Sequence, residues 1–227
     1  MRRALFLAVL LLTLAGVGAV ILRDARPEDL PWKPLTLDQP AGLATGYKLA
    51  RLDSDLPRCL AILQAGGIRF RVDPDRPLGA CPTSGVVRLQ AGMLSLEPGG
   101  PRMTCRQALA YSLWTRHSVR AAAEAELGEP IARIDHYGTF ACRNIAGSGA
   151  RSQHATANAL DVAGFRTRSG RRITIARDFG DPGAKGRFLH RVRDGACPWF
   201  RAVLSPDYNA AHRDHLHLDR GRYDTCA

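Results

Sequence analysis

The feature that most restricts this chain is an uninterrupted apolar run close to its N-terminus. Residues 4–22 read ALFLAVLLLTLAGVGAVIL, and two arginines, Arg2 and Arg3, precede them. A helix rises about 1.5 Å per residue, so this run spans about 28 Å, close to the thickness of a bilayer core. Arginines before such a helix orient its N-terminus toward the cytoplasm. The run therefore predicts that the rest of the chain is exported.

Two interpretations of residues 1–22 remain open, a cleaved signal peptide and an uncleaved signal anchor. The apolar core of a signal peptide usually holds about 7–15 residues, and this run is longer. In addition, no clean small-x-small cleavage site follows this run before the charged segment RDARPED. We favour the anchor, which attaches the body of the protein to the membrane through residues 4–22.

Cysteine usage agrees with export. All six cysteines follow the apolar run, their number is even, and none forms a CxxC pair: Cys59, Cys81, Cys105, Cys142, Cys197 and Cys226. Exported chains form disulfides, whereas cytosolic chains rarely do. The spacing argues against a zinc finger, which needs closely spaced thiols. Six cysteines allow about fifteen connectivities, and the sequence does not choose among them.

The formal net charge of +11 indicates an anionic partner. Nucleic acid, an anionic membrane surface and an acidic cell-wall polymer all satisfy this condition. Exported proteins seldom meet nucleic acid, so we expect no nucleic-acid partner and favour a wall polymer or a lipid surface. The oligomeric state is left open by the composition.

The chain after the apolar run divides into two parts. Residues 23–46 contain four prolines and no apolar periodicity, which predicts an extended linker. Residues 47–227 suffice for one domain with a full core. Helices are expected over 59–64, over 104–127, where Thr104 can cap the helix and Gly128 ends it, and over 186–204. Strands are expected at 68–72, 84–92, 93–98, 131–135, 137–142, 157–165, 171–179 and 215–219. This alternation predicts a compact α+β domain with a small, mostly antiparallel sheet flanked by helices.

Two clusters of histidine and aspartate can carry chemistry. The first, SQHATANALD, contains His154 and, seven residues later, Asp161 within an apolar strand pattern. A carboxylate there needs a partner, because burying an unpaired charge is very costly. The second, DHLHLD, places His215, His217 and Asp219 on one face of a strand. Two histidines and a carboxylate with one open position form the usual catalytic zinc site, whereas a polar strand end is the alternative.

These two clusters resemble the metal motifs of the LAS group of zinc peptidases, which includes D-alanyl-D-alanine carboxypeptidases and murein endopeptidases. More closely, the chain resembles the bacterial extensin-like C-terminal domain proteins. That resemblance covers about residues 59–226 and includes FACRN, SQHATANALDVAGF, FLHRVRDGACPWF and YNAAHRDHLHLD. It implies a periplasmic protein with a zinc site on its sheet.

The resemblance to the peptidases implies three ligands for one Zn²⁺, namely His154, Asp161 and His217. One departure concerns the loop between the first two ligands. The peptidase motif usually has glycine three residues after the first histidine, and this chain has Ala157 there. The spacing of the ligands is kept, but the geometry of the loop is not implied.

The same resemblance implies roles for residues beside the zinc ligands. Asp214 corresponds to the general base, and His215 to a helper that flanks the metal. Arg143 corresponds to an arginine near the polarised carbonyl oxygen. Ser152 corresponds to the motif serine, which fixes the loop or binds substrate. Apart from the resemblance, His212 lies close to the second cluster in the sequence and is a candidate for lining the substrate cleft. In a regular strand Asp214 points away from His217, so its role requires a turn before the strand.

The expected function is an exported zinc peptidase that hydrolyses amide bonds in peptidoglycan peptide stems. Since all proposed ligands and the base are present, we favour this over a non-catalytic wall-binding or envelope-structural module that retains the metal site. A metal-dependent hydrolase acting on another amide or ester is a third possibility.

Overall fold

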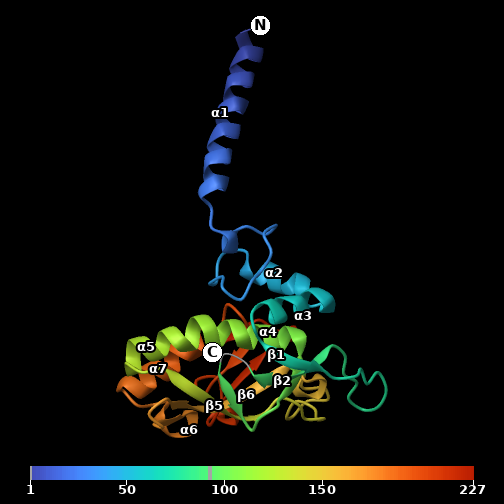
Figure 1. Ribbon diagram of the computed structural model, residues 1–227, viewed down its shortest axis with the longest axis vertical. Helices are drawn as coiled ribbons and strands as arrows, with labels where there is room; N and C mark the ends of the chain where they lie inside the picture. Colours follow the sequence, from blue (N-terminus) through green and yellow to red (C-terminus); the bar gives the residue numbers. More distant parts are fainter. Residues whose placement is uncertain (1, 92–93) are drawn as a thin grey trace.

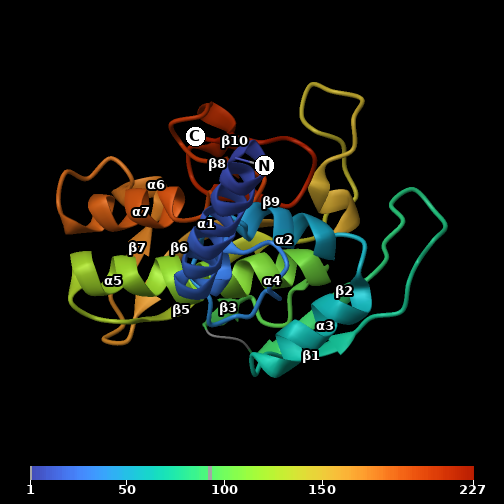
Figure 2. The same ribbon diagram turned by 90° about the horizontal axis from the view of Figure 1, so that it is seen from above.

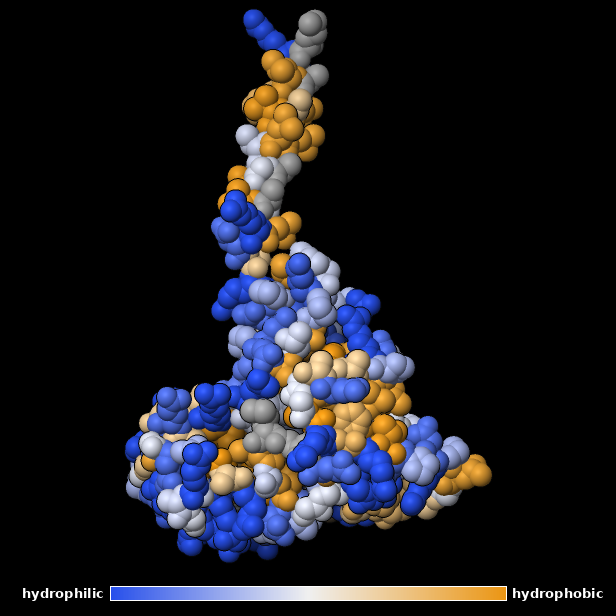
Figure 3. All heavy atoms as spheres, in the orientation of Figure 1, coloured by the Kyte–Doolittle hydropathy of each residue, from blue (hydrophilic) through white to orange (hydrophobic). Residues whose placement is uncertain are grey.

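The first helix stands apart from the rest of the protein. The computed structural model describes residues 2–91 and 94–227. In it, α1 (Arg2–Asp24) projects away from the body (Figure 1), and large apolar side chains along it, from Leu5 to Leu22, are exposed (Figure 3). By length and composition, Leu5–Asp24 can cross a membrane, a property that it shares with signal sequences. The helix therefore agrees with either a membrane anchor or a signal peptide.

The remaining elements form one body. Its helices are α2 (Thr45–Leu52), α3 (Leu56–Ala65), α4 (Cys105–Trp114), α5 (Arg120–Leu127), α6 (Ile175–Asp178) and α7 (Ala184–Asp194). Its strands are β1 (Arg69–Val72), β2 (Val86–Ala91), β3 (Ser95–Glu97), β4 (Arg102–Thr104), β5 (Ile131–Gly138), β6 (Ala159–Thr167), β7 (Arg172–Thr174), β8 (Ala202–Leu204), β9 (Leu216–Asp219) and β10 (Thr225–Cys226). Short helical turns are η1 (Pro27–Asp29), η2 (Thr115–Val119), η3 (Gln153–Thr156) and η4 (Ala210–His212).

The α+β class is confirmed and most strand pairs are antiparallel as expected, but the expectation of one small sheet is wrong. A three-stranded antiparallel sheet has the order β1-β2-β4, and a seven-stranded sheet has the order β10-β8-β9-β6-β5-β3, with β7 also paired to β6. The larger sheet is mixed, because β3 runs parallel to β5 and β10 runs parallel to β8. Between β3 and β5 the chain passes through α4 and α5, and such a crossover permits parallel pairing.

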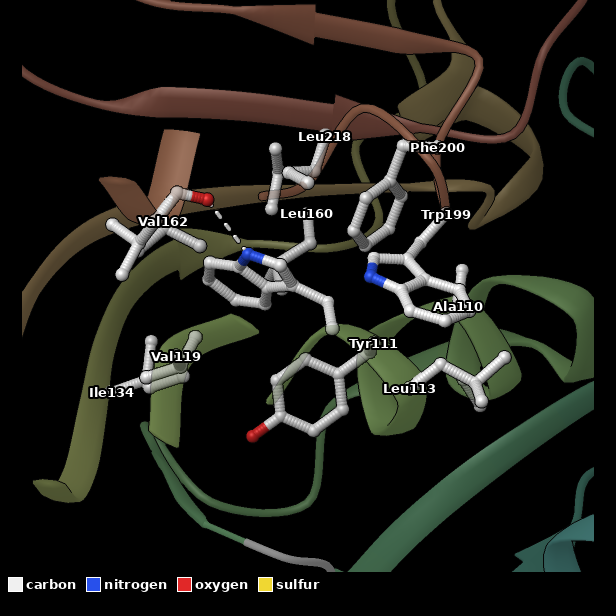
Figure 4. Close-up of a cluster of buried hydrophobic side chains, with 14 of the residues drawn as sticks. Ala110, Tyr111, Leu113, Val119, Ile134, Leu160, Val162, Trp199, Phe200 and Leu218 are labelled. Atoms are coloured by element: carbon white, nitrogen blue, oxygen red, sulfur yellow. Dashed lines mark hydrogen bonds between the residues drawn. The ribbon is translucent and has the colours of Figure 1, made fainter. Parts of the chain in front are cut away.

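Helices cover one face of the larger sheet (Figures 1 and 2). The ring of Trp114, at the end of α4, meets the ring of Phe165 on β6 edge-on, with centroids 6.2 Å apart, and α5 packs against α7. The core beneath them includes Trp114 and Trp199, both almost fully buried. The indole of Trp114 donates a hydrogen bond to the carbonyl of Val192 over 2.8 Å (Figure 4). This hydrogen bond satisfies the polar atom of the largest buried side chain and joins α4 to α7.

The helix expected over residues 104–127 forms α4, the π-helical turn η2 and α5. The hydroxyl of Thr104 accepts a hydrogen bond from the backbone N–H of Gln107, so it caps the helix as expected. At the other end Gly128 has φ of +64°, the left-handed conformation in which helices commonly stop. Both ends were therefore readable from the sequence.

Three other expected elements are corrected. The helix expected over 186–204 stops at Asp194, and residues 202–204 form β8 instead, because they pair with β9. No strand forms at 139–142, because β5 already continues to Gly138 and the chain then leaves the sheet. The strand expected at 171–179 ends at Thr174, and α6 follows. For the strand expected at 93–98, β3 spans 95–97, while residue 93, and residue 92 at the end of the strand expected at 84–92, lie outside the described residues.

The segment expected to be an extended linker packs against the body. Leu35 and Leu37 are buried in the main hydrophobic core. His117, which lies in η2, forms a hydrogen bond with the carbonyl of Leu37 over 2.9 Å. The expectation of an extended spacer is wrong for this part of residues 23–46, because its apolar side chains are buried on the domain. The division of the chain at those boundaries stays a prediction.

All six cysteines form disulfides. The pairs are Cys59–Cys105, Cys81–Cys142 and Cys197–Cys226. The first joins α3 to α4, and the third joins the segment after α7 to β10. The second ties the loop between β1 and β2 to the segment after β5, which leads to the first histidine cluster.

Candidate metal centre

We call the face of the larger sheet opposite the helices its uncovered face. On β6 and β9 this face carries the polar residues of both sequence clusters. Asp161 of β6 lies directly opposite His217 of β9. Their neighbours Leu160 and Leu218 pair in the same register and are fully buried in the core. Since alternate residues of a strand point to opposite faces, Asp161 and His217 lie together on the other face.

The histidine of the first cluster comes from the turn η3, immediately before β6. Its position depends on two local features. The hydroxyl of Ser152 accepts a hydrogen bond from the backbone N–H of His154 over 3.3 Å and so caps the turn. Ala157 then adopts φ of +57°, the left-handed conformation that normally favours glycine. This is the position at which the peptidase motif has glycine, so alanine here adopts a backbone conformation that glycine adopts more easily.

Three ligand atoms converge at this point. The Nε2 atom of His154 lies 3.1 Å from Oδ1 of Asp161 and 3.2 Å from Nδ1 of His217. The Nδ1 atom of His217 lies 2.9 Å from the same carboxylate oxygen. Within residues 2–91 and 94–227, this is the one group of three histidine, cysteine or acidic residues with metal-ligand spacing. The two clusters, far apart in sequence, therefore meet at one site.

The donor set fits zinc. Two imidazole nitrogens and a carboxylate oxygen are the ligands of many catalytic zinc sites. With metal–ligand distances of about 2.0–2.2 Å in a tetrahedral site, ligand atoms lie about 3.3 Å apart, close to the spacing observed. The other ring nitrogen of His217 contacts Oδ2 of Asp219 over 2.8 Å. Such a carboxylate fixes the orientation of a metal-binding imidazole, which explains the position of Asp219 on this face.

The charges of the site favour a cation between two carboxylates. Burial by itself raises the pKa of Asp161, but hydrogen bonds from His154 and His217 hold that pKa well below its ordinary value. Burial would lower the pKa of His217, but hydrogen bonds to Asp161 and Asp219 outweigh it and raise the pKa to about 9. An imidazole that donates from both nitrogens is positively charged. The site thus stabilises positive charge, which is also what a divalent metal ion supplies.

A second histidine–aspartate pair lies beside the three ligand residues. Residues 213–214 form a turn before β9 begins at Leu216. Through this turn, Oδ1 of Asp214 accepts a hydrogen bond from Nδ1 of His215 over 2.9 Å. The Nε2 atom of His215 faces the centre, 3.7 Å from Oδ1 of Asp161. The imidazole of His215 therefore stands between Asp214 and the ligand residues.

Comparison with known proteins assigns residues 57–227 to one protein family. The model of a family described as extensin-like protein C-terminus matches residues 57–227, which include both histidine clusters. The chain belongs to the extensin-like protein C-terminus family. No curated protein and no solved structure matches the chain significantly. The resemblance to LAS zinc peptidases thus stays a prediction.

Three other residues expected at the site of this extensin-like domain lie around it. His212 is half-buried, and its ring centroid lies 5.2 Å from that of His215. Burial and the neighbouring histidines His215 and His217 lower the pKa of His212 to about 4, and Arg143 contributes to the lowering. Arg143 is exposed, and its charge lies near enough to the site to act on the pKa of His212. Ser152 is buried and caps η3, which favours the loop-fixing role over the substrate-binding role.

Two residues of the extensin-like domain that received no role from the sequence also contribute. The exposed ring of Tyr137 meets the edge of the His215 ring, with centroids 5.9 Å apart. Asn158 is fully buried and donates a hydrogen bond to the side chain of Gln153 over 2.8 Å, while accepting one from Arg106 over 2.9 Å. This network braces the turn that carries the first ligand. An asparagine inside an apolar strand pattern was the available signal, because a buried amide requires partners.

Proposed function

We propose that this protein is an exported, zinc-dependent peptidase that hydrolyses amide bonds in the peptide stems of peptidoglycan. The observation that carries the proposal is the convergence of His154, Asp161 and His217 on one point of the sheet's uncovered face, 2.9–3.2 Å from one another. The paired side chains of His215 and Asp214 beside that point add a group that can move a proton.

The three converging residues would hold the metal, and Asp219 would orient His217. Zinc bound by such a donor set supplies Lewis acidity and a water with a pKa near 7. The protein itself then has to accept a proton, deliver it to the leaving amine and stabilise the charge that develops on the carbonyl oxygen.

We assign proton transfer to the pair formed by His215 and Asp214. The hydrogen bond from Nδ1 of His215 to Asp214 fixes the tautomer and leaves Nε2 free to accept a proton. Asp214, the base expected from the sequence, then acts by holding the ring and by stabilising its protonated form. After the amide is attacked, Nε2 of His215 returns the proton to the leaving nitrogen. Arg143 is the candidate for stabilising the carbonyl oxygen, because it is an exposed cation whose charge acts on His212 beside the centre.

The cellular setting in this proposal rests on three observations. The apolar helix α1 suits export or anchoring, and the three disulfides suit an oxidising compartment such as the periplasm. The net charge of +11 suits an anionic envelope polymer. Peptidoglycan satisfies the last condition and contains the amide bonds that the site is suited to hydrolyse.

The decisive experiment combines metal analysis with a digest. Full-length protein in detergent is expected to bind about one zinc ion and to release D-alanine or cleave cross-links from purified muropeptides. His215→Gln is expected to lower kcat at least about 100-fold while it keeps the zinc, because general acid–base catalysis contributes about 10²–10⁴-fold. His190→Gln, on α7 at the helical layer, is the matched control and should leave both unchanged.

Other outcomes would separate this proposal from the non-catalytic alternative. Zinc binding and sedimentation with peptidoglycan, without any cleavage product, would indicate a wall-binding module that retains the metal site. Failure to bind zinc even in excess metal would overturn the peptidase proposal. Full activity in His215→Gln would overturn the assignment of the proton-transfer residue.

A further inference from the structure

Three arginines form a row on the uncovered face of the larger sheet. Arg133 of β5 lies opposite Arg166 of β6, which in turn lies opposite Arg172 of β7. We call these three residues the arginine row. Their neighbours Ile134, Phe165 and Ile173 are buried in the core, so the arginines point to the other face, which also carries the candidate metal centre.

The arginine row has more cationic groups than nearby carboxylates. Asp135 lies among the guanidinium groups, with contacts of 3.4 Å to Arg133, 3.2 Å to Arg166 and 3.5 Å to Arg172. The exposed Glu97 adds a contact of 3.8 Å to Arg133. Two carboxylates therefore face three guanidinium groups, and the row keeps a net positive charge.

Most donors of the arginine row make no hydrogen bond with the described residues. Each guanidinium carries five N–H donors. Among the described residues, the hydrogen bonds from these side chains are those from Nε of Arg166 to Asp135. The side chains of Arg133, Arg166 and Arg172 are 34%, 36% and 55% exposed. A further carboxylate can therefore bind the planar N–H groups without displacing Asp135.

The arginine row is connected to the candidate metal centre along two strands. On β6, Arg166 lies five positions after Asp161, which corresponds to about 16 Å along a strand. An extra residue in β6 between the pairs His136–Val162 and Asp135–Gly164 keeps both side chains on the same face. On β5, Tyr137 follows Arg133 and Asp135. The residue is 61% exposed, and its ring contacts the ring of His215. Tyr137 therefore lies beside the centre, on the strand that leads to it from the arginine row, and offers an aromatic surface to a chain that spans them.

We propose that the uncovered face of the larger sheet binds an extended, carboxylate-bearing peptide whose acidic group contacts the arginine row. Tyr137 packs against the peptide before it reaches the candidate metal centre. An extended peptide advances about 3.3–3.6 Å per residue, so the recognised carboxylate lies about three to five residues from the hydrolysed bond. This inference rests on the proposed function for the identity of that bond, and it makes the arginine row a determinant of specificity.

The test compares two peptides and two double variants of the full-length protein in detergent. The probes are a dye-labelled peptidoglycan stem peptide with free carboxylates and the same peptide with its carboxylates converted to amides. Both are measured by fluorescence anisotropy in the His215→Gln background. The variant R133Q/R172Q removes two cations of the arginine row. The control R187Q/R191Q removes two exposed cations that pair with Glu126 on the helical layer, across the sheet.

The free-acid peptide is expected to bind R133Q/R172Q at least about tenfold more weakly than the parent, which is about 1.4 kcal/mol. The amidated peptide should change less than about twofold, and R187Q/R191Q should change neither. Unchanged circular dichroism of both variants would show that the fold is kept. Equal loss for both peptides, equal loss in both variants, or no preference of the parent for the free acid would overturn the proposal.

The two proposals fail in different ways. Selective binding that depends on the arginine row, without hydrolysis by the wild-type protein, would support the binding surface and overturn the peptidase function. Hydrolysis of both peptides with equal KM, unaffected by R133Q/R172Q, would support the peptidase and overturn the binding surface.

Discussion

Asp73 and Asp161 are both buried carboxylates on β-sheets, yet they are surrounded by different cations. Asp73 follows β1 in the three-stranded sheet and contacts Arg102 at 2.6 Å and Arg88 at 3.4 Å. Asp161, in the larger sheet, contacts His154 and His217 instead. In each case burial alone raises the carboxyl pKa, and the partners lower it below its ordinary value.

The difference between these two carboxylates is chemical rather than electrostatic. A guanidinium is always protonated and has no lone pair, so Asp73 has a permanent structural partner. An imidazole has a nitrogen lone pair that can bind a metal ion once its proton leaves. A lowered carboxyl pKa therefore does not identify a functional site by itself. The chemical group that pairs with the carboxylate, guanidinium or imidazole, distinguishes the two sites.

The largest effect is expected from Asp161→Asn. The substitution keeps the shape of the side chain but removes the ligand charge, so we expect zinc affinity to fall at least about 1,000-fold, which is about 4 kcal/mol. Isothermal titration with zinc measures it. Asp73→Asn should leave zinc affinity unchanged, and an equal loss in both variants would break the distinction between the two carboxylates.

A smaller effect is expected from Asp219→Asn, because this residue contacts His217 and not the metal position itself. Loss of such an orienting carboxylate typically costs 10–100-fold in metal affinity. The same titration measures the change, with Asp207→Asn as a control in an exposed ion pair. Wild-type affinity in Asp219→Asn would mean that the packing of β9 alone orients the imidazole.

Asp73→Asn is expected to act on stability, with a loss of about 1.5 kcal/mol at pH 7, because charged hydrogen bonds to Arg102 disappear. The pKa of Asp73 is lowered in the folded protein, so its contribution is complete above the ordinary carboxyl pKa of about 4 and vanishes as pH falls through the lowered value. Urea unfolding at several pH values checks this. A difference that persists unchanged at pH 2 would exclude the charge as its cause.

The smallest effect is expected from Ala157→Gly. Glycine relieves the left-handed backbone, worth about 1–2 kcal/mol, but loses a buried methyl group and adds freedom to the unfolded chain. The free energy of unfolding should therefore change by less than about 1 kcal/mol, and zinc affinity should be kept. Ala155→Gly, in the helical turn η3, is the matched control and should destabilise the protein. Equal losses at both positions would show that the left-handed conformation stores no strain.

Much of the candidate centre could be predicted because it follows from local patterns. Asp161 stands out as a carboxylate between Leu160 and Val162, and the alternation of His217 and Asp219 fixes their common face once the segment is a strand. Thr104 and Gly128 likewise mark the ends of a helical segment through local capping. The errors lie where tertiary pairing overrides local preference, as at residues 202–204, which became β8 beside β9.

The sequence by itself determined which chemical groups this protein has and which strand faces carry them, because capping and alternation act over a few residues. Only the tertiary structure decided that Asp161 lies opposite His217, that Asp214 holds His215, and which cysteines pair. These contacts depend on strand register and on the burial of one sheet face beneath the helices. They join residues tens of positions apart or depend on a turn, so no local pattern specifies them.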